Sequence, residues 1–227
     1  YLKRFPDVER FTVVEKKIVD STTLDHLYDR NIIKNVDFIK LDTQGSELDI
    51  LKGGEKLINE KIIGLQVEVE FKPMYKSQPL FHDIDIFLRE KLGFELFDIR
   101  KSYFKYNEGR GIGPSKGQLM FGDALYFRNP YEMPQWCGCF EDEEIQNKII
   151  MACFMGVLYG YPDYSLCLLE KAAGVNSINL EKYNKLKSFI IKDAHSIKYS
   201  FKGSDKIWNL LRIISKAFEP DTGGWSL

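Results

Sequence analysis

The sequence predicts an α/β fold followed by a segment that contains helices only. Residues 36–41 and 63–71 are rich in β-branched and apolar side chains, as strands are, and each run precedes a segment with apolar residues at helical spacing. Beyond residue 141 the pattern is helical throughout. Alternating strands and helices favour a doubly wound parallel sheet, and the last two strands, 94–99 and 118–128, are expected to form a terminal hairpin.

The first expected elements lead up to the strand at residues 36–41. Residues 11–19 alternate loosely and carry β-branched side chains, so we expect a strand there. Thr22, with Asp25 three residues later, resembles a capping box that begins a short helix. After the strand 36–41 a turn at Gly45 leads into a helix, for which Ser46 is the expected N-cap.

The strand at residues 63–71 has two unlike faces. Leu65, Val67 and Val69 lie on one face, whereas Gln66, Glu68 and Glu70 lie on the other. If Asp42 and Glu70 both stand at the ends of parallel neighbours, Lys40 falls beside Glu68. The two would then form a buried ion pair that fixes the strand register. The alternative is that Glu68 faces a pocket and binds an acceptor or a metal.

Composition excludes several classes of function. The chain has 227 residues, is 44% hydrophobic and has a formal net charge of −1, so it lacks the basic field of nucleic-acid-binding proteins. Its longest apolar run, residues 149–161, is shorter than the roughly 20 residues that span a bilayer. Its four cysteines (Cys137, Cys139, Cys153 and Cys167) lack the spacing of a zinc site, so we assign none of them to a metal site and expect a reducing, cytoplasmic location.

Several blocks of sequence resemble a known family. In order they read VDFIKLDTQGSELDILKGG, LQVEVEFKPMY, PLFHDIDIFL, GFELFDIR and GDALYFR. Over about residues 22–128 the chain is similar to the FkbM family of S-adenosylmethionine-dependent methyltransferases. The resemblance implies a Rossmann-like class I methyltransferase sheet, S-adenosylmethionine as cofactor, and O-methylation of a hydroxyl on a glycan or secondary-metabolite precursor.

The resemblance covers the second half of that domain. The glycine-rich turn and the ribose-binding acid of class I methyltransferases do not occur before Thr22, and 21 residues cannot hold two βα units of roughly 30 residues each. We therefore expect a partial methyltransferase domain at residues 1–135, the donor-binding half being absent, and a helical extension at 136–227.

Asp42 is the strongest candidate for catalysis. It ends a central strand directly before a helix N-terminus, where ligands bind in open α/β sheets. It could act as a base, a metal ligand or, given the resemblance, a clamp on the amino group of the cofactor. It could instead cap the helix. Glu68, at the family's LQxE glutamate, is the second catalytic candidate.

Other candidates surround these two. We expect Thr43 and Gly45 to assist Asp42 in cofactor binding, and Gln44, Glu47, Glu70, Tyr75 and His82 to bind the acceptor. Tyr75 belongs to the family's FxPxY pattern and could stack on a sugar or simply pack on a helix. Glu47 could merely stabilise the helix dipole, and His82 could be a surface side chain.

A rival function belongs to another class. The chain could be a non-catalytic binding or scaffold module derived from a methyltransferase, with the helical extension as its interaction surface. Under either function the acceptor or ligand is a small molecule or a glycan. A homodimer could form through the C-terminal helices, with Phe154, Leu158, Trp208 and Leu211 at the interface.

Overall fold

The computed structural model describes residues 2–5, 9, 12–113, 116–138 and 142–196. The chain divides into two compact units, one up to Phe127 and one from Arg128 on. Each unit is described by itself below. The domain boundary expected at residue 135 stays a prediction, and Cys139, Trp208 and Leu211 lie outside the described residues.

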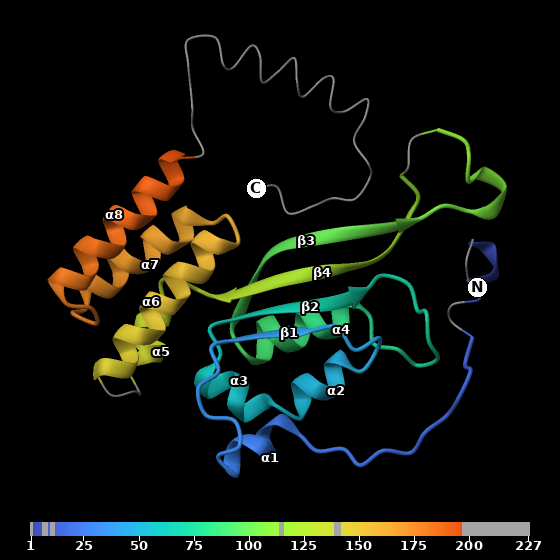
Figure 1. Cartoon of the computed structure of the whole chain (residues 1–227), viewed down its shortest axis with the longest axis horizontal. Coiled ribbons are helices and arrows are strands. Elements are labelled where there is room, and N and C mark those ends of the chain that lie inside the picture. Colours follow the sequence, from blue (N-terminus) through green and yellow to red (C-terminus); the bar gives the residue numbers. More distant parts are fainter. Residues whose placement is uncertain (1, 6–8, 10–11, 114–115, 139–141, 197–227) are drawn as a thin grey trace, which may run out of the picture. The chain divides into compact units, whose positions relative to one another are not determined.

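The first unit is built on a four-stranded sheet with the order β1-β2-β4-β3 (Figure 1). Its strands are β1 (Phe38–Leu41), β2 (Gly64–Glu70), β3 (Phe94–Phe104) and β4 (Gln118–Arg128). β1 and β2 pair in parallel, and β2 and β4 pair antiparallel. The sheet is therefore mixed: β1 and β2 are parallel, as expected, and β4 runs antiparallel to β2. β3 and β4 are hydrogen-bonded neighbours, as the predicted terminal hairpin requires.

Short helices connect these strands. They are α1 (Leu24–Asp29), α2 (Glu47–Lys52), α3 (Glu55–Lys61), α4 (Phe81–Ile86) and its π-helical continuation η3 (Phe87–Lys91), with short 3-10 turns η1 (Leu2–Arg4) and η4 (Asn107–Gly109) elsewhere. The N-cap of α1 is Thr23, whose hydroxyl accepts from the His26 amide at 3.1 Å. The N-cap is thus Thr23 and not Thr22 as expected, and the structure gives it a cap bond to the His26 amide in place of the expected capping box. Its partner Asp25 instead accepts from the amides of Lys56 and Leu57 at 3.0 and 2.8 Å and anchors the start of α3.

The core lies between one face of the sheet and the helices α2, α3 and α4. Leu65, Val67 and Val69 of β2 are fully buried and pack with Leu51 of α2 and Ile84 of α4. Burial of such side chains contributes about 1.5–3 kcal/mol each, so this face carries much of the stability of the unit. The helices of this core cover the Leu65 face, whereas a doubly wound sheet has helices on both faces.

Residues 12–23 form no strand, which corrects the expectation for residues 11–19 in the part that the structure describes. Val14 and Ile18 are 98% and 103% exposed. A strand needs a hydrogen-bonded neighbour, and the sheet of the described residues contains only β1 to β4. The β-propensity of this segment therefore has no partner strand to act on.

The second unit contains helices and no strand in its described part after β4, as predicted. The helices are α5 (Met133–Cys137), α6 (Asp142–Leu158), α7 (Pro162–Gly174) and α8 (Leu180–Ser196). Gly156 lets α6 approach α7, because a Cβ there would collide with the Ser165 hydroxyl. Phe154 and Leu158 are exposed, and the dimer interface expected there stays a prediction. Among the described helices, none has both the length and the apolar character needed to cross a membrane.

Candidate functional site

Three carboxylates line up across three neighbouring strands on the polar face of the sheet. The parallel register pairs Lys40 with Gln66 and Leu41 with Val67, so the next residue, Asp42, comes beside Glu68. On the other side of β2, the antiparallel register pairs Glu68 with Asp123 of β4. We call Asp42, Glu68 and Asp123 the carboxylate row. Alternate residues of a strand point to the same face, so the helix-covered Leu65 face is the opposite one.

This register corrects the expected pairing of Lys40 with Glu68. The pairing assumed that Asp42 stands beside Glu70, but the strands are shifted by two residues relative to that alignment. Lys40 is an exposed residue of β1, and its Nζ lies 3.5 Å from Asp42 Oδ2. Its ammonium group therefore remains in solvent, where an ion pair adds little to stability.

Gln44 joins the carboxylate row to the turn after β1. Its Nε2 donates to Glu68 Oε2 at 2.8 Å and to Asp42 Oδ1 at 3.3 Å, and its Oε1 accepts from the Tyr75 hydroxyl at 3.4 Å. The backbone of Gln44 has a φ of +59°, a conformation that is uncommon outside glycine. The turn thus holds Gln44 in an unfavourable conformation that lets one amide bridge two acids, as strained residues at functional sites often do.

Glu47 shapes the turn from its inner side. The side chain is fully buried, and its carboxylate accepts from the Thr43 amide at 2.7 Å, the Thr43 hydroxyl at 2.9 Å and the Gly45 amide at 2.9 Å. Glu47 thus holds the turn that precedes α2. Ser46 is the N-cap of α2, as expected, but makes no side-chain cap bond. The Thr43 and Gly45 amides are already occupied by Glu47.

Glu68 is poised to exchange a proton near neutral pH. The side chain is buried, and burial raises its pKa to about 7, with Asp42, Glu47 and Asp123 adding to the rise in that order. A carboxyl group with such a pKa can be a carboxylate or a neutral acid under ordinary conditions. It is thus suited to general acid–base chemistry.

Glu70 lies behind the row, two residues after Glu68 on the same face of β2. It is fully buried, and neither of its oxygens has a hydrogen-bond partner. Burial raises its pKa to about 8, and Glu47 and Glu68 raise it further, whereas its own backbone amide and the nearby Gln78 amide act in the opposite direction. At neutral pH Glu70 therefore holds a proton.

Tyr75 and His82, the other two residues expected to bind the acceptor, lie in different places. Tyr75 is at the rim, partly exposed, with its hydroxyl on Gln44. His82 projects from α4, is exposed, and has Nε2 3.4 Å from Asp83 Oδ1. The structure thus brings Asp42, Gln44, Glu68 and Tyr75 together, and it gives His82 no hydrogen bond to them in the described part.

Two residues of the site were not anticipated. Asp123 is an acid inside the apolar strand 118–128, and that isolated charge was the signal in the sequence. Gln78 accepts from the amides of Met74 and Tyr75 at 2.9 and 3.1 Å, while its buried Nε2 has no partner. A Cβ on Gly45 would come within 3.0 Å of that Nε2, and Gly45 has a φ of +113°. Glycine is therefore required here both by its backbone conformation and by the approach of Gln78.

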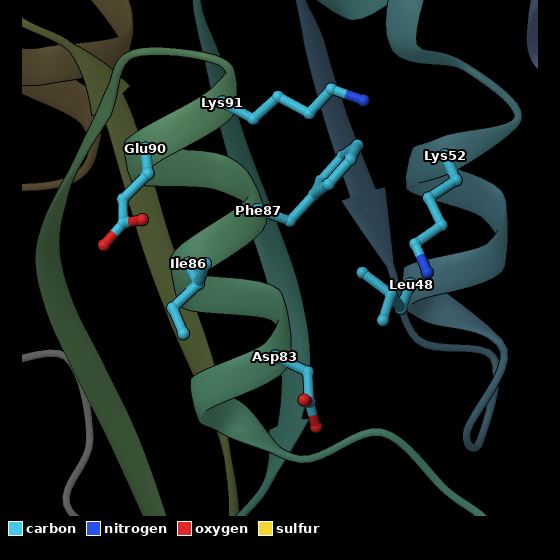
Figure 2. A pocket seen from close by; sticks show the side chains of 7 residues that line it. All are labelled: Leu48, Lys52, Asp83, Ile86, Phe87, Glu90 and Lys91. Carbon is cyan, nitrogen blue, oxygen red and sulfur yellow. The ribbon is translucent and has the colours of Figure 1, made fainter.

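A separate groove of about 480 Å³ lies on the helix layer (Figure 2). It is lined by Leu48, Lys52, Asp83, Ile86, Phe87, Glu90 and Lys91. Leu48 of α2 and Phe87 of η3 point toward one another across it, and Lys91 above them pairs with Glu55 at 2.6 Å. None of the expected site residues lines this groove, so the geometry does not connect it with the carboxylate row.

The described residues contain no group of three or more His, Cys, Asp or Glu side chains arranged to hold a metal ion. The three acids of the carboxylate row therefore lie side by side but are not arranged as a three-ligand metal site. What it offers is a set of hydrogen-bond acceptors with excess negative charge. Such a set can take up a proton, a hydroxyl hydrogen or an organic cation.

Neither the curated proteins nor the solved structures gave a match. A family model did match, over a segment that begins and ends earlier than the resemblance inferred from the sequence and that includes β1, β2 and the turn between Asp42 and Glu47. Residues 4–96 of this chain match the model of the methyltransferase FkbM domain.

Proposed function

We propose that the chain is part of an S-adenosylmethionine-dependent O-methyltransferase that acts on a hydroxyl group of a glycan or secondary-metabolite precursor. The match of residues 4–96 to the FkbM domain supports the methyltransferase class. The observation that carries the proposal is the placement of Asp42 beside Glu68, whose pKa burial raises to about 7. The strand order β1-β2-β4-β3 also fits the second half of a Rossmann-like methyltransferase sheet.

The chemistry assigns one task to each of the two acids. S-adenosylmethionine supplies, when bound, an electrophilic methyl group on a sulfonium centre. As the acceptor oxygen bonds to that methyl carbon, the carbon–sulfur bond breaks, a neutral thioether leaves, and the acceptor hydroxyl must lose its proton. Glu68 takes this proton, because a base is most effective when its pKa lies near the working pH. Asp42, exposed at the end of β1, accepts a hydrogen bond from the acceptor and orients it.

The turn supports these roles by preorganisation. Gln44 donates to both Asp42 and Glu68, so the two carboxylates are held before the acceptor arrives. Tyr75 adds an exposed aromatic ring at the rim, where a sugar face can stack. Holding catalytic groups in the reactive geometry removes entropy that would otherwise be lost in the reaction.

The cofactor fits part of this site. The exposed Asp42 carboxylate can accept from the ammonium group of S-adenosylmethionine. The Thr43 and Gly45 amides are occupied by Glu47, so their proposed part is to shape the turn and not to donate to the cofactor directly.

Binding and transfer can be tested separately. S-adenosylmethionine is titrated into the chain by calorimetry, and transfer of its labelled methyl group to glycans and polyhydroxylated metabolites is measured. We expect Glu68→Gln to lower the transfer rate by roughly 10²–10⁴-fold, as for removal of a general base, while cofactor binding and melting temperature persist. Asp42→Asn should lower it as well.

The matched control is Asp98→Asn, which removes one exposed carboxylate from β3 of the same sheet. It should leave transfer unchanged. Because the donor-binding half of the domain is expected to be absent from residues 1–135, both measurements are made on this chain and on the protein extended upstream. If the extended protein neither binds S-adenosylmethionine nor transfers its methyl group, the enzyme function is wrong and the scaffold function takes its place. If Glu68→Gln transfers at the full rate, Glu68 is not the base.

A further inference from the structure

Helix α6 carries a stripe of exposed apolar side chains. Met151, Phe154 and Leu158 are 41%, 44% and 72% exposed. Their positions correspond to i, i+3 and i+7, so they lie on one face of the helix. Cys153 lies on the other face, where its Sγ donates to the Ser165 carbonyl of α7 at 3.4 Å. The exposed stripe is therefore on the side of α6 that points away from α7.

Helix α8 lies beside α6 and extends this apolar surface. Near the beginning of the two helices, Asn179 Nδ2 donates to Gln146 Oε1 at 3.2 Å. Further along both helices, the ring centroid of Phe189, which is 42% exposed, lies 5.2 Å from that of Phe154. The two helices therefore run in the same direction, with an apolar seam between them. We call Met151, Phe154, Leu158 and Phe189 the open seam.

The open seam has the character of an interaction surface. Single exposed apolar residues are common on proteins, but contiguous patches of large apolar side chains mark places where another surface binds. Two helices that run side by side can accept a further helix across their seam, because its side chains fit between their ridges. An amphipathic helix is therefore the partner that this surface fits.

The sequence beyond α8 supplies such a segment. Residues 205–218 read DKIWNLLRIISKAF. Apolar side chains recur in it at helical spacing, at Ile207, Leu211, Ile214 and Phe218. Ser204 before this run and Pro220 after it are typical of the places where helices begin and end. These residues lie outside the described part of the chain, and the sequence pattern predicts an amphipathic helix for them.

The connection from α8 is long enough for this segment to fold back on the open seam. α8 ends at Ser196, about 10 Å beyond Phe189 along the helix axis. Residues 197–204 can span up to about 26 Å, so they can make the return. As a helix, residues 205–218 would be about 21 Å long, against about 25 Å for α6. The segment therefore matches the seam in reach and in length.

The charges fit the same arrangement. Helices joined by a short connection pack antiparallel, so the second half of residues 205–218 comes beside the first half of α6. That half of the segment contains Arg212 and Lys216. The first turn of α6 contains the acids Asp142, Glu143 and Glu144. Opposite charges therefore come together in the antiparallel orientation.

We propose that residues 205–218 form an amphipathic helix that packs antiparallel to α6 and α8 and covers the open seam. The chain thus provides the partner for its own exposed apolar surface. The inference does not depend on the proposed methyltransferase function, because it uses only the helices of the second unit and the sequence that follows them.

A second copy of the chain is the competing occupant, since Phe154 and Leu158 were expected to form a dimer interface. A short connection holds a tethered segment near its binding surface at an effective concentration on the order of millimolar. A second copy at micromolar concentration competes poorly with such a segment. The open seam is therefore covered within one chain and is not available to a dimer.

Photo-crosslinking identifies the occupant directly. Phe154 is replaced by p-benzoylphenylalanine, an aromatic residue that links to a neighbouring C–H bond on irradiation. The full chain is irradiated at micromolar concentration, and the linked peptides are identified by mass spectrometry. We expect a link to residues 205–218 in a product that migrates as a monomer. The same replacement at Asp163, an exposed position of α7, is the control and should give no such link.

A matched pair of variants tests the apolar face of the segment. Leu211→Asp and Asn209→Asp each add one negative charge, the first on the predicted apolar face and the second opposite to it. Because burial of an unpaired charge is costly, Leu211→Asp should lower the yield of the link at least about 10-fold. Asn209→Asp should leave the yield unchanged. Hydrogen exchange of the α7 amides shows whether the helices remain folded in both variants.

The other outcomes overturn the inference. A product of the mass of a dimer identifies a second copy as the occupant. A link to other residues, or no link, shows that residues 205–218 do not lie on the open seam, and equal yields in the two variants show that their apolar face is not used. No step needs S-adenosylmethionine, so failure here leaves the proposed function standing, and failure of methyl transfer leaves the covered seam standing.

Discussion

The two faces of β2 differ in what they do. On one face Leu65, Val67 and Val69 are completely buried against α2, α3 and α4. On the other, Glu68 and Glu70 are buried as well, but among acids that raise the pKa of both. The same seven residues of backbone thus carry a stabilising surface and a destabilising one.

The apolar face of β2 explains how the first unit can hold a row of acids on the other face. A row of like charges costs free energy, and the apolar face directly behind it offsets this cost. Burial, which stabilises the fold, also raises the pKa of Glu68 and Glu70 above the ordinary value of a glutamate. Stability and reactivity are therefore set by opposite sides of one strand.

The largest expected effect comes from the apolar face. Leu65→Ala leaves a cavity beneath the helix layer and should lower the free energy of unfolding of the first unit by about 2–5 kcal/mol. The matching substitution on the polar face, Glu68→Gln, removes a charge opposite Asp123. It should raise the free energy of unfolding by less than about 1 kcal/mol. Urea unfolding of both variants measures the contrast, and a large loss in Glu68→Gln would contradict it.

A second effect concerns pH. The folded pKa of Glu70, about 8, lies above the ordinary value for the unfolded chain, so between these values the folded state holds a proton that the unfolded state has lost. The free energy of unfolding should therefore fall as the pH rises through this range. The Glu70→Gln variant lacks this titrating group. Between about pH 5 and about pH 9, its free energy of unfolding should therefore fall by less than that of the original protein, the difference being on the order of 1–3 kcal/mol.

Thermal unfolding at several pH values measures this slope. Glu68, with a pKa raised to about 7, adds to the slope at lower pH, and it faces Asp42, Glu47 and Asp123. The control Asp98→Asn should keep the slope of the original protein. A Glu70→Gln variant with an unchanged slope would show that Glu70 ionises normally.

The smallest effect on stability is expected at Gln44. Glycine adopts the φ of +59° at this position without strain, so Gln44→Gly should change the free energy of unfolding by no more than about 1 kcal/mol. It removes the 2.8 Å hydrogen bond to Glu68, however, and with it a donor that favours the carboxylate. A carboxyl ¹³C titration should show the pKa of Glu68 rising further, and a fall would contradict the bridging role.

Much of the fold could be predicted from the sequence. β4 has the predicted bounds, β2 differs by one residue at each end, and the helical character of residues 142–196 is confirmed. These segments have strong periodicity, which local sequence encodes well. The strand expected at residues 11–19 is wrong for residues 12–19, because a strand depends on a partner that local sequence does not reveal.

The sequence predicted which residues form the candidate site better than it predicted how they pair. Asp42, Gln44 and Glu68 do come together, because the ends of parallel neighbours meet at one edge of the sheet. The pairing of Lys40 with Glu68 failed because a shift of two residues keeps every side chain on its face and so leaves the hydrophobic pattern unchanged. Asp123 was missed because only the antiparallel return of β4 brings it to Glu68.

Lys40 lies on an edge of the sheet that the described residues form. In the sheet of the described residues β1 is the first strand, with β2 as its one hydrogen-bonded neighbour, and Lys40 stands exposed within it. An exposed edge strand invites pairing with the edge of another molecule, and a lysine there makes such pairing costly because its charge would lose water. The residue that was expected to pair with Glu68 inside the sheet thus lies on an edge of the sheet of the described residues, where its charge disfavours pairing with the strand of another copy.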